Sequence, residues 1–113
     1  MSNLIVFNLE NPGTPKESMA LPERLVDGKP SYKTWERDNV DNGRIRSGIW
    51  EATPGATRSI TGGTREYCTI LSGLLELTED DKEPRRFVAG DTFTMRPGST
   101  IASAKTPVRG SDR

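Results

Sequence analysis

Eleven glycines and eight prolines are spread along the 113 residues of this chain, and they do not form a repeat. Glycine supplies the positive φ angles of tight turns, and proline removes a backbone donor and interrupts a helix. A chain divided in this way has room for short strands and turns, and little room for long helices. Apolar residues make up only 32%, which is enough for one modest core. We therefore predict an all-β domain of many short strands.

Length and charge balance restrict the class of protein. A chain of 113 residues corresponds to one domain. Sixteen basic and sixteen acidic residues give a formal net charge of zero, so no overall field attracts nucleic acid or an anionic membrane. The one cysteine, Cys68, cannot form an intramolecular disulfide, and the first thirty residues lack the layout of a signal peptide. We predict a cytoplasmic protein with no nucleic-acid or membrane partner.

Three parts follow one another along the chain. Residues 1–31 are predicted to form an N-terminal arm, with a short strand at Leu4–Phe7 and one helical turn between residues 15 and 21. Regular strand signals then begin, and they define a predicted barrel over residues 32–98. Residues 99–113 contain few large apolar side chains and end in a segment with proline, glycine and charges. This last part is predicted to be a loose tail.

Turn residues separate the predicted strands of the barrel. The sequence Asp41-Asn42-Gly43 predicts a hairpin, because Asn-Gly favours the tight turns that join antiparallel strands. Gly73 permits another tight reversal, since glycine takes a positive φ without a Cβ clash. The sequence Ala89-Gly90-Asp91 marks a third turn. The predicted strands between these turns are therefore short.

Alternation along two strands predicts which side chains face the interior. Along residues 66–71, Glu66, Cys68 and Ile70 share one face, and Tyr67 lies on the opposite face. Phe93 and Met95 share a face in the same way and are predicted to belong to the core.

The spacing of several residues matches two motifs of a known family. These residues are Gly55, Glu66, Gly73, Gly90 and Gly98. The pattern resembles the cupin family, and this resemblance implies an RmlC-like jelly-roll barrel, also called a double-stranded β-helix. The histidines that cupin motifs usually carry are missing, because the chain contains no histidine. Thr61 and Gly63 stand at the two histidine places of the first motif.

Further segments narrow the resemblance. The chain is similar to small single-domain cupins grouped with the (S)-ureidoglycine aminohydrolase cupin domain, which implies a homodimer. The segments that carry this similarity are residues 48–51, 53–55, 66–68 and 90–93. Such proteins usually continue after the Pro-Gly turn with an aromatic residue, a glycine and a tryptophan, and residues 99–113 depart from that pattern. If the tail is loose, the barrel lacks one or two closing strands and exposes an unpaired edge.

Glu66 is the strongest candidate for chemistry. The cupin resemblance places it on an inward face, where a carboxylate could act as a general base or as a single metal ligand. The alternative interpretation is a buried ion pair with an arginine, because buried carboxylates need partners. Cys68 shares this face and could contact a ligand, but an inert buried cysteine is the simpler interpretation.

Two other residue types could contact a ligand. Trp50 could stack against a flat molecule, although tryptophans in small domains more often fill the core. Arg58 could help to hold a carboxylate at the barrel mouth, because guanidinium groups bind carboxylates in a bidentate geometry. Arg44, Arg46 and Arg65 could line the same mouth. The alternative interpretation is that all four arginines lie at solvated strand edges.

The missing histidines bear on cofactor and function. Without imidazole ligands the chain cannot build the usual cupin metal shell, so we predict no metal and no other cofactor. We favour a metal-free cupin that binds a small molecule of unknown identity or serves as an accessory protein. One alternative is an enzyme similar to ureidoglycine aminohydrolase or to sugar-modifying cupins, with Glu66 in the reaction. A truncated family member without function is the other alternative, favoured by residues 99–113.

Overall fold

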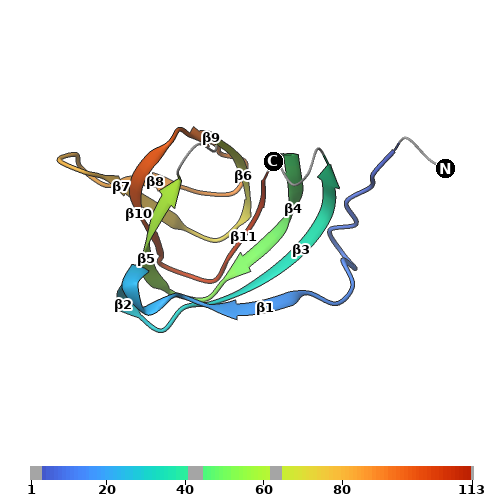
Figure 1. Ribbon diagram of the computed structural model, residues 1–113, viewed down its shortest axis with the longest axis horizontal. Helices are drawn as coiled ribbons and strands as arrows, with labels where there is room; N and C mark the ends of the chain where they lie inside the picture. Colours follow the sequence, from blue (N-terminus) through green and yellow to red (C-terminus); the bar gives the residue numbers. More distant parts are fainter. Residues whose placement is uncertain (1–3, 41–44, 62–64, 113) are drawn as a thin grey trace.

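The computed structural model describes residues 4–40, 45–61 and 65–112. Within these residues, eleven strands form two antiparallel sheets, and one short 3-10 helix connects two of the strands (Figure 1). In spatial order, the first sheet contains β1 (Lys16–Met19), β3 (Ser31–Val40), β4 (Ile45–Ala52), β11 (Val108–Asp112), β6 (Glu66–Ser72) and β9 (Thr92–Met95). The second contains β2 (Leu25–Gly28), β5 (Gly55–Thr61), β10 (Gly98–Ala104), β7 (Leu75–Glu79) and β8 (Arg85–Phe87). The predicted all-β class is confirmed.

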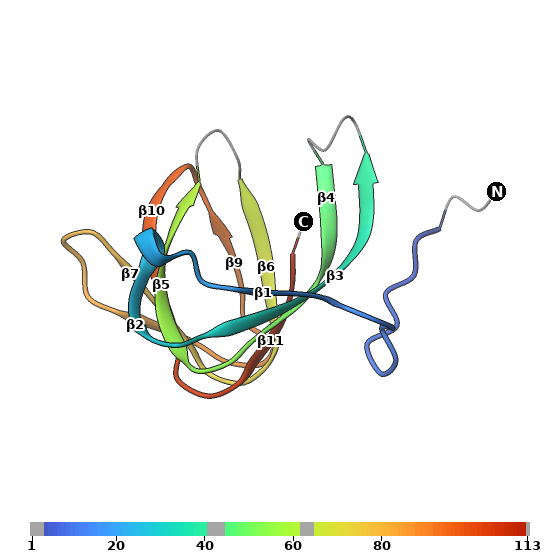
Figure 2. The same cartoon turned by 60° about the horizontal axis from the view of Figure 1, so that its bottom comes forward.

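The chain passes back and forth between the two sheets. From β4 onward, the strands of the first sheet are β4, β6, β9 and β11, and those of the second are β5, β7, β8 and β10. This alternation is the connectivity of a jelly roll, in which two sheets enclose one interior. Figure 2 shows the strands from β5 to β11 curving around that interior. No helix in the described part of the chain is long and apolar enough to cross a membrane.

Residues 98–112 form a central strand in each sheet, so the prediction of a loose tail is wrong. β10 pairs with β5 on one side and β7 on the other, and β11 pairs in the same way with β4 and β6. The predicted incomplete barrel is corrected as well, and the ground for a truncated, non-functional family member is removed. The sequence pattern was misleading because these central strands carry small residues. Gly110, for example, lies against the Trp50 ring, where an added Cβ would be 2.5 Å from a ring carbon.

The core lies between the two sheets. Its most buried side chains are Ile70, Cys68 and Val108, which are at most 2% exposed. Ile49 is fully buried as well, but it alternates with Trp50 on β4 and so lies on the opposite face of the first sheet. Phe93 and Met95 pack against the main apolar cluster, as predicted from their shared face. The predicted alternation along β6 is confirmed, because Cys68 and Ile70 are buried while Tyr67 is 43% exposed.

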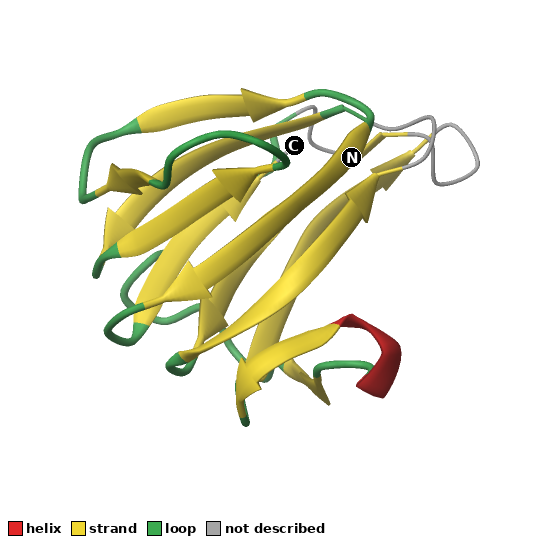
Figure 3. Ribbon diagram, turned by 90° about the vertical axis from the view of Figure 1, so that its left-hand side faces the viewer, coloured by secondary structure: helices red, strands yellow, loops and turns green. Residues whose placement is uncertain are grey.

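The N-terminal residues differ from the prediction. Leu4–Phe7 does not form a strand, and residues 16–19, predicted to lie in a helical turn, form β1 at the edge of the first sheet (Figure 1). The short 3-10 helix, red in Figure 3, follows them in the chain. An apolar segment becomes a strand only beside a partner strand, and β3 offers its edge to β1 instead. The 3-10 helix Pro22–Arg24 then leads to β2 at the edge of the second sheet.

Two further contacts order this end of the molecule. The indole Nε1 of Trp35 donates a hydrogen bond to the backbone oxygen of Gly13 at 2.8 Å, and Trp35 is only 7% exposed. Trp35 therefore holds the N-terminal segment against β3. The predicted hairpin between β3 and β4 is confirmed by their antiparallel pairing, although its turn, Asp41-Asn42-Gly43, lies outside the described residues.

Candidate functional site

A cavity of about 170 Å³ lies between the two sheets. Strands from both sheets line it, because the inward faces of β4, β6 and β9 look toward those of β5, β7 and β10. Most of its lining is apolar, including Leu77, Ala102 and Ala104. The polar residues of the lining that matter for chemistry are Tyr32, Trp50, Thr57, Ser59, Glu66 and Cys68. Three of the four residues predicted to contact a ligand, Trp50, Glu66 and Cys68, therefore lie together at one cavity.

Glu66 and Cys68 form the polar end of β6 in this cavity. The Cys68 thiol donates a hydrogen bond to Oε1 of Glu66, with a sulfur to oxygen distance of 3.1 Å. Glu66 is partly buried and Cys68 is 1% exposed. In the described part of the chain, no lysine or arginine nitrogen lies within ion-pair distance of the Glu66 carboxylate, so the predicted ion pair with an arginine is not found there. A partly buried carboxylate with one weak donor retains capacity to accept hydrogen bonds.

Trp50 reaches the cavity from β4 and is partly buried. Its ring packs over the backbone of Gly110 on the neighbouring strand β11. The indole Nε1 is buried without a hydrogen-bond partner among the described residues. Because the ring lies over a residue without a side chain, it can be held flat against the wall of the cavity.

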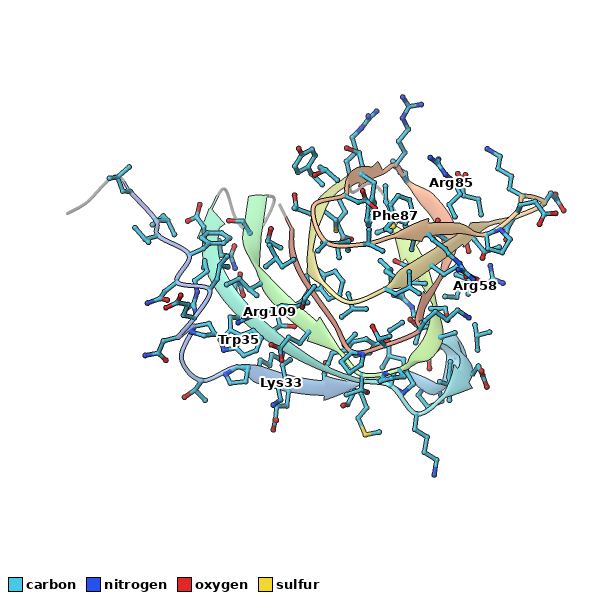
Figure 4. All side chains as sticks on the ribbon, turned by 180° about the vertical axis from the view of Figure 1, so that it is seen from behind. Lys33, Trp35, Arg58, Arg85, Phe87 and Arg109 are labelled. Atoms are coloured by element: carbon cyan, nitrogen blue, oxygen red, sulfur yellow. The ribbon has the colours of Figure 1, made fainter. Side chains whose placement is uncertain are left out.

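Arg58 lies on the other side of β5. Its strand neighbours Thr57 and Ser59 line the cavity, so alternation turns Arg58 to the outer face (Figure 4). There its Nη1 donates to Ser99 Oγ at 2.8 Å and lies 3.3 Å from Oδ1 of Asp80. The structure therefore corrects the predicted place of Arg58 at the ligand. Of the other arginines in the proposed mouth, Arg65 is exposed, and Arg44 lies outside the described residues.

Sequence reasoning missed one polar group of the cavity. The Tyr32 hydroxyl donates to Thr57 Oγ1 at 3.2 Å, which joins β3 to β5 across the interior. Ser59 follows two residues later on the same face of β5. Alternation along residues 55–61 would have placed Thr57 and Ser59 together, but it could not have shown that Tyr32 reaches them from the other sheet.

The donor set does not fit a metal of the usual cupin kind. The chain contains no histidine. Among the described residues that line the cavity, Glu66 and Cys68 are the only carboxylate or thiol side chains, and the Cys68 thiol donates a hydrogen bond to Glu66. Among the described residues, no group of three or more histidine, cysteine, aspartate or glutamate side chains could hold an ion. Structural and catalytic zinc sites take at least three protein ligands, and the described lining of the cavity does not supply them.

Comparison with known proteins gives one family. A family model described as the EutQ-like cupin domain matches residues 40–111. This range includes β10 and most of β11, which the predicted barrel of residues 32–98 had left out. No curated protein matches the chain.

Solved structures of several proteins share the fold. A DUF861 family protein of unknown function from Pseudomonas syringae pv. tomato is 20% identical with a TM-score of 0.75, covering 88% of this chain and 42% of that chain. The EutQ protein of Clostridium difficile is 18% identical with a TM-score of 0.62, covering 74% of this chain and 61% of that chain. A DUF861 family protein from Thermotoga maritima is 29% identical with a TM-score of 0.54, covering 57% and 74% respectively. These similarities confirm the predicted jelly-roll fold.

Proposed function

The chain belongs to the EutQ-like cupin family, and on this premise we propose that it binds a small amphipathic molecule, without a metal, in the cavity between its sheets. The observation that carries the proposal is the Glu66 carboxylate, which lies partly buried at this cavity with no cation beside it in the described part of the chain. Removing a charge from water without a partner is costly, so a ligand that donates hydrogen bonds to Glu66 would bind favourably.

The size and lining of the cavity indicate the class of ligand. A cavity of roughly 150 Å³ holds a benzene-sized molecule, and this one is about 170 Å³. Its apolar walls suit a flat ring, which Trp50 could contact through its face. Glu66 requires N–H or O–H donors, and the hydroxyls of Thr57 and Ser59 can accept or donate. We therefore propose a ring with an attached amide or amine as the ligand class.

We expect benzamide to bind the protein, and Glu66→Gln to weaken its binding about tenfold or more, because a hydrogen bond to a charged acceptor contributes about 1.5–3 kcal/mol. Isothermal titration calorimetry with and without a chelator measures both the affinity and its independence of metal. Glu51→Gln is the matched control, since Glu51 lies on the outer face of the first sheet beside Arg109. Equal affinities for the two variants, or binding that requires added Mn²⁺ or Zn²⁺, would contradict the proposal.

Other predictions from the sequence stay predictions. They are the cytoplasmic location, the homodimer and the narrower relation to the ureidoglycine aminohydrolase cupins. If a second copy binds, exposed apolar side chains on and between β1 and β2 offer one surface for it, namely Met19, Leu21, Leu25 and Val26.

A further inference from the structure

A second hollow adjoins the cavity. This groove of about 360 Å³ is lined by residues of β8 and β9, which are the edge strands of opposite sheets. Leu77, Phe93 and Met95 line both the groove and the cavity, so these three side chains form the boundary between them. Met95 is unbranched and flexible, which makes it the part of this boundary most able to move aside. A ligand larger than the cavity could therefore extend into the groove.

Among the described residues, two cations line the groove, Arg85 and Arg96, and Arg85 is an exposed residue whose strand position places it on the inner face of β8. In the pairing of β7 with β8, Leu77 lies opposite Arg85 and Leu75 lies opposite Phe87. Because Leu75 and Leu77 face the cavity, alternation places Arg85 and Phe87 on the same inner face. The Arg85 guanidinium carbon is 5.8 Å from the centre of the Phe87 ring (Figure 4). Phe87 in turn packs against Phe93, with ring centres 4.7 Å apart.

Arg85 has no carboxylate partner among the described residues. Its neighbour Arg86 differs, because alternation turns it outward and its Nε lies 3.5 Å from Oε2 of Glu76. A guanidinium group that stacks on a ring keeps its N–H donors available, and those donors match the oxygens of a carboxylate or a phosphate.

Other charged groups border the same groove. Glu79 also lines the groove, but its Oε2 is 3.5 Å from the ammonium nitrogen of Lys82. Glu83 is an exposed residue of the preceding turn, and Arg96 adds a positive charge at the rim after β9. Arg85 and Glu83 therefore have no ion-pair partner among the described residues of the groove, and of these two Arg85 is the one that lies beside the Phe87 ring.

We propose that this groove is a second binding subsite, which holds an anionic group of the ligand against Arg85. The inference rests on the proposed function, because the apolar part of the same ligand would occupy the cavity beside Glu66. The ligand class then becomes a small ring with hydrogen-bond donors and a carboxylate or phosphate on a short linker. The contact of the guanidinium group with the Phe87 ring favours this position of Arg85.

The test compares probes that differ only in charge. Hippurate carries a ring, an amide and a carboxylate, and hippuramide is its neutral counterpart. We expect the wild-type protein to bind hippurate at least tenfold more tightly than hippuramide in calorimetric titrations. Arg85→Gln should abolish this preference and leave the affinity for hippuramide unchanged. Arg86→Gln removes the same charge from the outer face and should preserve the preference. Phenyl phosphate, compared with phenol, shows whether a phosphate replaces the carboxylate.

The outcomes separate this inference from the proposed function. If hippuramide and hippurate bind with equal affinity, or if Arg85→Gln and Arg86→Gln have the same effect, the anionic subsite is wrong while the cavity proposal stands. If neither hippurate, hippuramide nor benzamide binds the wild-type protein, the cavity proposal is wrong and the subsite is wrong with it. Circular dichroism of both arginine variants confirms that a loss of preference does not come from unfolding.

Discussion

We expect deletion of residues 99–113 to abolish the cooperative unfolding transition of this protein. The deletion removes β11 and all but the first residue of β10, and each of these strands lies between two others in its sheet. Four strands, β4, β5, β6 and β7, would lose their pairing on one side, and the core would lose Ala104 and Val108. Domains are stable by only about 5–15 kcal/mol, so the loss of two central strands exceeds what the remaining sheets can offset.

Thermal and urea unfolding followed by circular dichroism measure this effect. Deletion of residues 1–9 is the matched control, because the described residues of that segment belong to no strand and most are exposed. We expect this second deletion to keep a sharp transition close to that of the full chain. A sharp transition in the protein without residues 99–113 would contradict the central position of β10 and β11.

Gly73→Ala should destabilise the protein far more than Gly90→Ala. The two glycines have nearly the same backbone conformation, with φ of 92° at Gly73 and 93° at Gly90. An alanine therefore costs about 1–2 kcal/mol at either position through its left-handed conformation alone. An added Cβ at Gly73 would also collide with the backbone oxygen of Pro107 and lie 2.9 Å from Cα of Val108, whereas at Gly90 it meets no atom within 4 Å.

The difference between the two variants isolates the cost of this collision. Val108 begins β11 and Pro107 directly precedes it, so relief of the clash must shift a central strand. We expect the free energy of unfolding to fall at least twice as much for Gly73→Ala as for Gly90→Ala, measured from urea midpoints with unchanged slopes. Equal losses would mean that β11 moves away from Gly73 without cost, contrary to the packing described above.

Several features of the fold could be predicted because they depend on neighbouring residues in the sequence. The positive φ of Gly73 follows from a turn that needs a residue without Cβ, and the structure confirms it. The inward positions of Cys68 and Ile70 follow from the period of two along a strand, and so does the shared face of Phe93 and Met95. Glu66 was placed at the cavity by its position in a motif that itself reflects strand alternation.

Features that depend on distant partners could not be predicted in this way. Arg58 was expected at the ligand, but its orientation depends on which face of β5 meets the other sheet. Leu4–Phe7 has a strand-like composition and forms no strand. The mostly polar segment Lys16–Met19 forms a strand because it pairs with the edge of β3. The groove at Arg85 brings together strands that are neighbours in neither sheet.

The sequence by itself determined the all-β class, the turns and the inward faces of individual strands, because glycine, proline and alternation act on neighbouring residues. Only the tertiary structure decided that residues 98–112 are central strands and that Trp50, Glu66 and Cys68 share one cavity. The physical reason is that a strand is stabilised by the edges and side chains beside it. Ala102, Ala104 and Gly110 carry little apolar surface of their own, but strands on both sides and the Trp50 ring over Gly110 hold them in place.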